Sequence, residues 1–139
     1  MSHAAFISSH RVTYAECTVG NHVYYARYLD ILEKARGEFF RHLDHPLLVL
    51  QAQDLAFPVL ESRLKYLSPA RYDDLLQIRL WITLIKGVRL NFAYTILNPK
   101  GKPALEAETF HCCANLSEKP RRIPEDLHRQ LAETLTGHH

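Results

Sequence analysis

The chain has 139 residues, of which 47% are hydrophobic and 23% are charged, and its net charge is +2 when histidine is neutral. This length and composition are typical of a single soluble globular domain with one core, so residues 1–139 are treated as one domain. The small net charge excludes recognition of nucleic acid by bulk electrostatics, although clustered cations would still suit an anionic small molecule.

The N-terminal segment and the cysteines indicate the compartment in which the protein acts. No basic region followed by an apolar run opens the chain, so no signal peptide is predicted. No apolar run approaches the roughly 20 residues needed to cross a bilayer. Cys17, Cys112 and Cys113 are odd in number and two are adjacent, which is not a disulfide framework. A reducing, cytoplasmic compartment is therefore expected.

A strand and a long helix are predicted in the first third of the chain. Residues 5–14 alternate, and the side chains on one face of this strand are Phe6, His10, Val12 and Tyr14. After Gly20, bulky apolar residues recur at i, i+3, i+4 and i+7, which predicts one helix to about residue 43. Asn21 stands where this helix is expected to begin and is its candidate N-cap. His45-Pro46 ends the helix, because proline cannot continue it.

Strands separated by turns follow the helix. They are predicted at residues 57–66, 75–85, 88–98 and 104–115, and a short amphipathic helix is predicted at residues 125–135. Turn formers such as Pro69 and Gly87 separate the strands. One long helix between a first strand and four strands in hairpin succession is an α+β layout. A twisted antiparallel sheet of about five strands would then curl around the central helix.

Five short motifs occur in an order that resembles one fold family. The turn before the helix reads Tyr14-Ala15-Glu16-Cys17-Thr18-Val19-Gly20-Asn21-His22-Val23-Tyr24-Tyr25. The later motifs are Leu32-Glu33-Lys34-Ala35-Arg36, Tyr66-Leu67-Ser68-Pro69-Ala70-Arg71-Tyr72-Asp73-Asp74, Glu106-Ala107-Glu108 and Lys119-Pro120-Arg121-Arg122-Ile123-Pro124. Their succession covers nearly the whole chain and resembles the hotdog fold, specifically the acyl-CoA thioesterases of the 4-hydroxybenzoyl-CoA thioesterase superfamily. The most similar branch is that of the bacterial Tol-Pal-associated acyl-CoA thioesterases.

Thr18 is the main departure from the family pattern. In the family, the second Asp of an Asp-Thr-Asp sequence is the catalytic carboxylate, and Thr18 occupies that position. A threonine hydroxyl is not ionised near neutral pH unless a base activates it. Glu16 matches the first Asp, and on an extended strand its side chain would point to the same side as that of Thr18. Glu16 would then act as the base, directly or through a water, provided that burial raises its pKa.

A second branch shows how hydrolysis can proceed without that carboxylate. The hotdog thioesterases that release enediyne polyketides resemble this chain around Val23-Tyr24-Tyr25. The Asn and the helix Arg that are implicated in their catalysis match Thr18 and Arg36. The resemblance implies that a polar side chain holds the attacking water and that a backbone N–H near Tyr25 stabilises the oxyanion.

Each candidate catalytic residue also has a purely structural interpretation. Thr18 either positions water or caps the turn, and Glu16 is either the base or an exposed strand carboxylate. His22 is either a general acid or base or a structural residue at the helix start. Arg36 either contacts the substrate or the oxyanion, or only pairs with Glu33. These alternatives stay open at the level of the sequence.

The candidate substrate-binding residues are Asn21, Tyr24, Lys86 and Arg89. Tyr24 and its neighbour Tyr25 would line an acyl pocket or simply pack at the helix start. Lys86 and Arg89 flank a turn, where they would hold the phosphates of coenzyme A or remain solvated cations.

No metal and no other cofactor is predicted. The sequence His111-Cys112-Cys113 lacks the two spaced ligand pairs of a structural zinc site. A nucleophilic Cys17 would need a histidine and an electropositive setting, so a small buried hydrophobic residue is the favoured interpretation.

The resemblance implies a homo-oligomer, either a dimer or a homotetramer, with each active site between two subunits. The expected reaction is hydrolysis of an acyl-CoA, or of an acyl carrier protein conjugate as in polyketide-type thioesterases. The alternative from another class is a hotdog protein that binds acyl-CoA or a carrier-bound chain without cleaving it. A hotdog dehydratase is a weaker interpretation, because no His-Phe-Pro sequence precedes the central helix.

Overall fold

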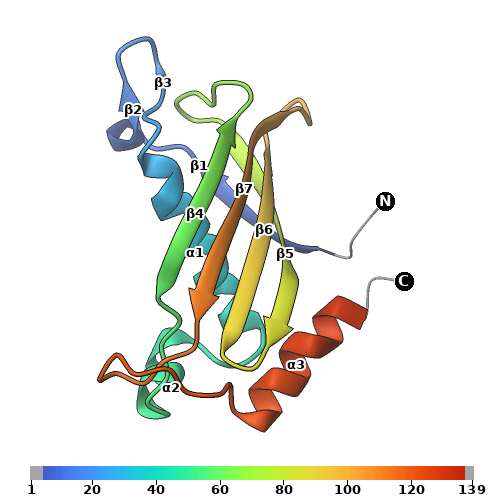
Figure 1. Cartoon of the computed structure of the whole chain (residues 1–139). Helices are drawn as coiled ribbons and strands as arrows, with labels where there is room; N and C mark the ends of the chain where they lie inside the picture. Colours follow the sequence, from blue (N-terminus) through green and yellow to red (C-terminus); the bar gives the residue numbers. More distant parts are fainter. Residues whose placement is uncertain (1–4, 137–139) are drawn as a thin grey trace.

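A five-stranded antiparallel sheet is the main element of the computed structural model, which describes residues 5–136 (Figure 1). Its strands are β1 (Phe6–Arg11), β4 (Val59–Tyr66), β5 (Leu75–Lys86), β6 (Arg89–Leu97) and β7 (Pro103–Cys112). The helices are α1 (Arg27–His42), α2 (Leu47–Ala52) and α3 (Glu125–Thr136). A 3₁₀ turn, η1 (Tyr14–Glu16), and a small hairpin of β2 (Cys17–Thr18) and β3 (His22–Val23) precede α1. The predicted α+β class is confirmed.

The strands lie in the order β1-β5-β6-β7-β4, and each neighbouring pair is antiparallel. Strands β5, β6 and β7 form the expected succession of hairpins. The prediction is wrong for β4, which pairs with β7 at the edge of the sheet and not with β5. Both sides of β5 are occupied, by β1 and β6, so residues 67–74 carry the chain across the end of the sheet (Figure 1).

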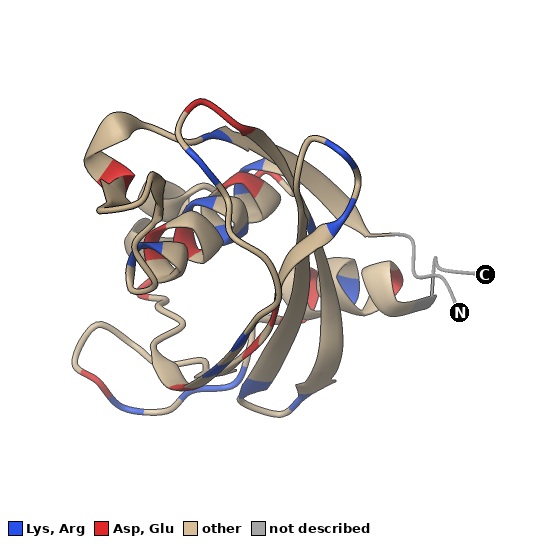
Figure 2. Cartoon of the chain, turned by 90° about the horizontal axis from the view of Figure 1, so that it is seen from above, with Lys and Arg blue, Asp and Glu red and all other residues tan. Residues whose placement is uncertain are grey.

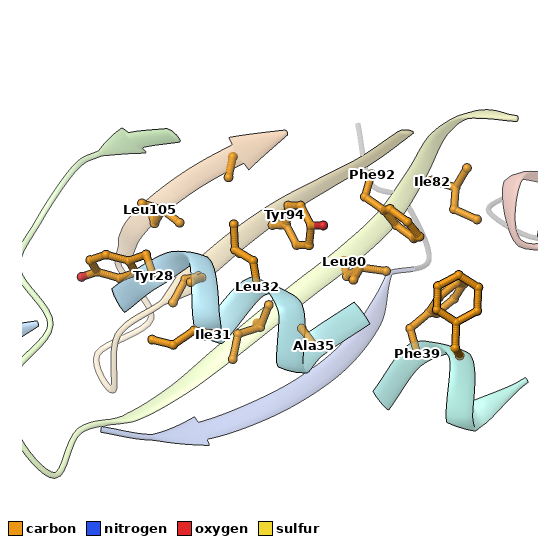
Figure 3. Packing of buried hydrophobic residues seen from close by; sticks show 14 of the residues in the cluster. Tyr28, Ile31, Leu32, Ala35, Phe39, Leu80, Ile82, Phe92, Tyr94 and Leu105 are labelled. Carbon is orange, nitrogen blue, oxygen red and sulfur yellow. The ribbon is translucent and has the colours of Figure 1, made fainter. Parts of the chain in front are cut away.

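The core lies between α1 and the inner face of the sheet (Figure 3). Along β5, the buried side chains alternate with more exposed ones and are Leu76, Ile78, Leu80 and Ile82. The buried face of α1 consists of Tyr28, Ile31, Leu32, Ala35, Phe39 and Phe40, which recur at helical spacing. Because full burial of one leucine or isoleucine contributes roughly 1.5–3 kcal/mol, this face fixes α1 firmly on the sheet.

The central helix begins later than predicted. It starts at Arg27 with Ala26 at the N-cap position, and not near Asn21. Asn21 instead belongs to the hairpin turn between β2 and β3, where its φ is 59° and its N–H donates to the Thr18 carbonyl at 3.1 Å. The preceding Gly20 has a φ of 90°, which glycine adopts without steric cost. The apolar spacing continued through a hairpin and therefore misplaced the helix start.

The first strand ends earlier than predicted. It stops at Arg11, and Tyr14 opens η1 with 81% of its surface exposed, so Tyr14 does not share the inner face of the strand. The cause is a capping box, in which Thr13 and Glu16 each bond the other's backbone. Val12 remains buried, and its N–H donates to the Asp74 carbonyl at 2.9 Å.

The predicted C-terminal helix is confirmed as α3, which buries Leu127 and Leu131. Gln130 joins it to the end of α1, because its side-chain oxygen accepts from His45 Nε2 at 2.7 Å and its amide donates to the Leu43 carbonyl at 3.2 Å. Acidic and basic residues are interspersed over the helices and loops (Figure 2). Within residues 5–136, no helix is long and apolar enough to cross a membrane.

Candidate functional site

The segment between β1 and α1 is fastened to the loop that follows β4 (Figure 1). Val23 N–H donates to the Ala70 carbonyl at 2.8 Å, and the Tyr72 N–H donates to Asn21 Oδ1 at 3.3 Å. The Arg71 guanidinium lies 3.4 Å from the Asn21 carbonyl and donates to it. Asn21, predicted to bind substrate, therefore uses its side chain to hold the turn in place.

A cavity of about 510 Å³ lies between the β2–β3 hairpin, the start of α1 and the loop after β4. Its lining residues are Thr18, His22, Val23, Tyr24, Tyr25, Tyr28, Tyr66, Leu67, Ser68 and Pro69. Four of the predicted site residues, Thr18, His22, Tyr24 and Tyr25, therefore meet at one cavity. Its volume is in the range of small-molecule sites.

Thr18 and His22 are paired directly across the β2–β3 ladder. Side chains of directly opposed strand residues share one face, so the hydroxyl and the imidazole are presented together to the cavity. The imidazole lies over Gly20, where an added Cβ would approach its Cδ2 and Nε2 to 3.3 Å. A hydroxyl beside an imidazole is a pair of groups that can hold a water and remove its proton.

A backbone N–H is available at the start of α1. The Arg27 N–H donates to the Tyr24 carbonyl at 2.8 Å, whereas within residues 5–136 we find no acceptor for the Tyr25 N–H. The Tyr25 carbonyl accepts from the Tyr66 hydroxyl at 3.2 Å, which helps to fix this peptide. A free N–H at a helix start can stabilise a developing oxyanion, as predicted for this position.

Tyrosine rings form one wall of the cavity. The centroid distances are 4.7 Å for Tyr24–Tyr25, 6.3 Å for Tyr25–Tyr66 and 5.7 Å for Tyr28–Tyr66. Burial raises the pKa of Tyr28 and of Tyr66, so both phenols stay protonated at neutral pH. Neither Tyr28 nor Tyr66 is among the site residues predicted from the sequence, although Tyr66 opens one of the quoted motifs.

Glu16 does not lie on an extended strand beside Thr18. It sits in η1, where its carboxylate accepts from the Thr13 N–H at 2.8 Å and contacts His10 Nε2 at 2.9 Å. Burial alone would raise the pKa of Glu16, but the hydrogen bonds from Thr13 and His10 hold it below its ordinary value. A general base needs the opposite shift, and Glu16 does not line the cavity.

Arg36 lies inside the helix–sheet interface, and the alternative in which it only pairs with Glu33 is wrong. Its guanidinium donates to the Tyr94 hydroxyl at 3.0 Å, and that hydroxyl lies 2.6 Å from Thr109 Oγ1. Thr109 Oγ1 lies in turn 2.8 Å from His111 Nε2. Within residues 5–136, no carboxylate forms an ion pair with Arg36.

The protons of this buried chain can be assigned. His111 Nδ1 lies 2.9 Å from the Phe57 carbonyl, which only accepts, so Nδ1 carries the proton and Nε2 accepts from Thr109. Tyr94 then donates to Thr109. Burial lowers the pKa of His111 to about 4, so its imidazole is neutral. His111 therefore has a structural role, and Arg36 is not brought to the cavity within one subunit.

Lys86 and Arg89 are paired across the β5–β6 turn, as predicted, at the end of the sheet opposite the cavity (Figure 1). Within one subunit they do not meet the other site residues. Burial, together with the charges of Glu16 and Asp74, raises the pKa of the Cys17 thiol, which is unfavourable for a nucleophile.

An antiparallel sheet around one long helix, with a cavity at the start of that helix, is the hotdog architecture of thioesterases. The family model described as the thioesterase-like superfamily matches residues 12–131. This chain belongs to the thioesterase-like superfamily. The predicted hotdog thioesterase is thereby confirmed.

Named relatives and solved structures agree with this placement. The acyl-CoA thioester hydrolase YbgC of Escherichia coli O157:H7 is 36% identical over 118 residues, which are 84% of this chain and 88% of the relative. The hypothetical protein TT1821 from Thermus thermophilus superposes with a TM-score of 0.85 at 30% identity, covering 91% of this chain and 96% of its own. A probable thioesterase from Bartonella henselae has a TM-score of 0.82 at 30% identity, with coverages of 87% and 100%.

Proposed function

We propose that this protein hydrolyses acyl-CoA thioesters at the cavity between the β2–β3 hairpin and the start of α1. The observation that carries the proposal is that the Thr18–His22 pair and the Tyr25 N–H, which has no acceptor within residues 5–136, lie at one cavity. The similarity to YbgC, which is named an acyl-CoA thioester hydrolase, supports the choice of substrate.

The proposed reaction uses water as the nucleophile. The thioester carbonyl oxygen accepts from the Tyr25 N–H, and the Thr18 hydroxyl holds a water against the carbonyl carbon. His22 takes a proton as the water oxygen bonds to that carbon, and the Tyr25 N–H stabilises the oxyanion that forms. The C–S bond then breaks, and the leaving thiolate takes the proton from His22. In this assignment His22 replaces Glu16 as the base.

The tyrosine wall supports an apolar or aromatic acyl group. Tyr24 and Tyr25 are 44% and 61% exposed, whereas Tyr28 is nearly buried, so the wall deepens toward the core. Aromatic faces contribute large apolar contact area and accept other rings at an offset or edge-on. The acyl group is therefore placed along the four tyrosines, with the coenzyme A moiety toward solvent.

A second subunit is proposed to complete the site. Strand β4 is an edge strand whose side chains are exposed over nearly its whole length, and such an edge can pair with another chain. Lys86 and Arg89 can hold coenzyme A phosphates only if they come from another subunit, because they lie at the opposite end of their own sheet. We therefore propose a homo-oligomer, a dimer or a tetramer.

The free thiols of Cys17, Cys112 and Cys113 suit the expected cytoplasmic location.

The test is release of free coenzyme A thiol over short, long and aromatic acyl-CoAs. Turnover by the wild type that falls about 100-fold in His22→Gln, and is unchanged in the control His128→Gln on α3, would support the proposal. No turnover, with acyl-CoA still raising the melting temperature, would replace it by the non-catalytic binder. Turnover of acyl carrier protein conjugates alone would show that these conjugates, and not acyl-CoAs, are the substrate.

A further inference from the structure

Three ionisable side chains that do not line the cavity form a chain of contacts with one another. His10 on β1 is 8% exposed, and its Nε2 lies 2.9 Å from both carboxylate oxygens of Glu16. Its other ring nitrogen, Nδ1, lies 3.2 Å from Lys34 Nζ on α1. Lys34 is exposed, and no carboxylate within residues 5–136 forms an ion pair with it.

The direction of these hydrogen bonds follows from the groups themselves. A lysine ammonium has only donors, so His10 Nδ1 must be the acceptor of the Lys34 bond. His10 Nε2 then carries the ring proton and donates it to the Glu16 carboxylate. The Thr13 N–H also donates to Glu16, which keeps this carboxylate fixed and ionised. The imidazole of His10 therefore lies between the carboxylate of Glu16 and the amine of Lys34.

We propose that Glu16, His10 and Lys34 form a relay that makes Lys34 a site of covalent acylation by activated acyl donors. A nucleophile within reach of a base that is oriented by a third group is the arrangement that activates nucleophiles in enzymes. Here the base is buried and fixed, while the amine reaches solvent. The inference goes beyond the proposed hydrolysis and does not require it, because the donor reaches Lys34 from solution.

The acylation step balances without any further reactant. Lys34 transfers one ammonium proton to His10 Nδ1, and the Glu16 carboxylate stabilises the imidazolium that forms. The free amine attacks the carbonyl carbon of an acyl-CoA, a C–N bond forms and the C–S bond breaks. As the amide forms, the attacking nitrogen gives up its second proton. The coenzyme A thiolate takes one proton from His10, and the other passes to solvent. The product is a neutral amide, so the charge of Lys34 is lost.

The chain contains an internal control for this reaction. Lys100 lies in the turn between β6 and β7 and is exposed, as Lys34 is. Within residues 5–136, we find no hydrogen bond or ion pair made by its ammonium group. Both lysines therefore meet the same donor in the same sample, and only Lys34 has an imidazole beside it.

The experiment uses the full chain with acetyl-CoA and, separately, with the hydroxysuccinimide ester of acetic acid. Mass spectrometry of peptides measures acetylation of Lys34 and Lys100 over time. Lys34 is expected to react at least about tenfold faster with both donors, because a positioned base usually contributes about 100-fold or more. In His10→Gln and in Glu16→Gln, the Lys34 rate should fall toward that of Lys100, whose own rate should not change.

Equal rates at Lys34 and Lys100 in the wild type would overturn the relay, and this result does not depend on whether a variant folds. An unchanged ratio in a folded His10→Gln protein would also overturn it. Thr18→Ala separates this inference from the proposed hydrolysis, because it should lower thiol release and leave Lys34 acetylation unchanged. Loss of Lys34 labelling in Thr18→Ala would mean that the acyl group comes from the active site and not through the relay.

Discussion

Thr18 and His22 are direct cross-strand partners in the short ladder between β2 and β3, and both line the same cavity. The hairpin presents a hydroxyl and an imidazole at the position where the resemblance described from the sequence leads us to expect a catalytic carboxylate. Glu16, the nearest carboxylate in the motif, is turned toward His10 and the Thr13 N–H. The proposed base is therefore His22, with Thr18 holding the water.

A side chain at Gly20 should strain the hairpin turn. Gly20→Ala places a Cβ 3.3 Å from the His22 ring and forces alanine into a φ of 90°, which costs about 1 kcal/mol or more. We expect a lower midpoint of urea unfolding and lower turnover, because the imidazole is displaced. Gly37→Ala is the matched control, since a Cβ there meets nothing within 4 Å and alanine favours a helix interior by about 1 kcal/mol. Wild-type stability and turnover in Gly20→Ala would contradict this description of the turn.

Glu16 should act on stability and not on the chemical step. Its pKa in the folded protein lies below the ordinary value of 4.5, so the ionised carboxylate stabilises the fold above pH 4.5. That contribution is lost as the pH falls through the lower, folded-state pKa. At pH 7, Glu16→Gln should cost about 1–2 kcal/mol in urea unfolding and change turnover little. Glu61→Gln, at an exposed pair with Arg63, is the control and should cost under about 0.5 kcal/mol. Loss of turnover in a folded Glu16→Gln protein would restore the base role to Glu16.

His111 should make the protein sensitive to mild acid in a different pH range. Its pKa of about 4 in the folded state lies below the ordinary 6.5, so the unfolded chain binds this proton first as the pH falls. Stability from the neutral imidazole is complete above pH 6.5 and declines between 6.5 and about 4, by about 3 kcal/mol in total. Urea unfolding of wild type and His111→Gln at pH 7 and pH 5 measures this. The variant should lose less stability over that interval, and an equal loss in both proteins would contradict the assignment.

Much of the fold can be predicted from the spacing of apolar residues along the sequence. Buried and more exposed side chains alternate from Leu76 to Ile82 in β5, as expected of a strand with one buried face, and the helical spacing of apolar residues predicted α1. The start of this helix was not predicted correctly, because the bulky residues from His22 to Tyr25 have spacings that suit either a helix or a strand. The decisive feature was the pair of positive φ angles at Gly20 and Asn21, which belong to a hairpin turn.

The candidate site also contains residues that the sequence could predict and residues that it could not. Thr18, His22 and Tyr25 were predicted together because one short motif carries them, and local geometry brings them to one cavity. Tyr66 and Ser68 come from a loop remote in the sequence, and no local spacing indicates that this loop crosses the sheet end beside α1. Contacts such as those of Glu16 with His10 and of Arg36 with Tyr94 depend on strand register and helix rotation, which a single sequence does not fix.

The most direct test of the central claim is the rate of coenzyme A thiol release by four proteins at pH 7: wild type, Thr18→Ser, Thr18→Ala and His22→Gln. Thr18→Ser keeps the hydroxyl and should remain close to wild type, Thr18→Ala should lose about tenfold, and His22→Gln about 100-fold. Melting temperatures and circular dichroism confirm that each variant is folded. Wild-type turnover in folded Thr18→Ala and His22→Gln proteins would contradict the claim that this hydroxyl–imidazole pair carries out the hydrolysis.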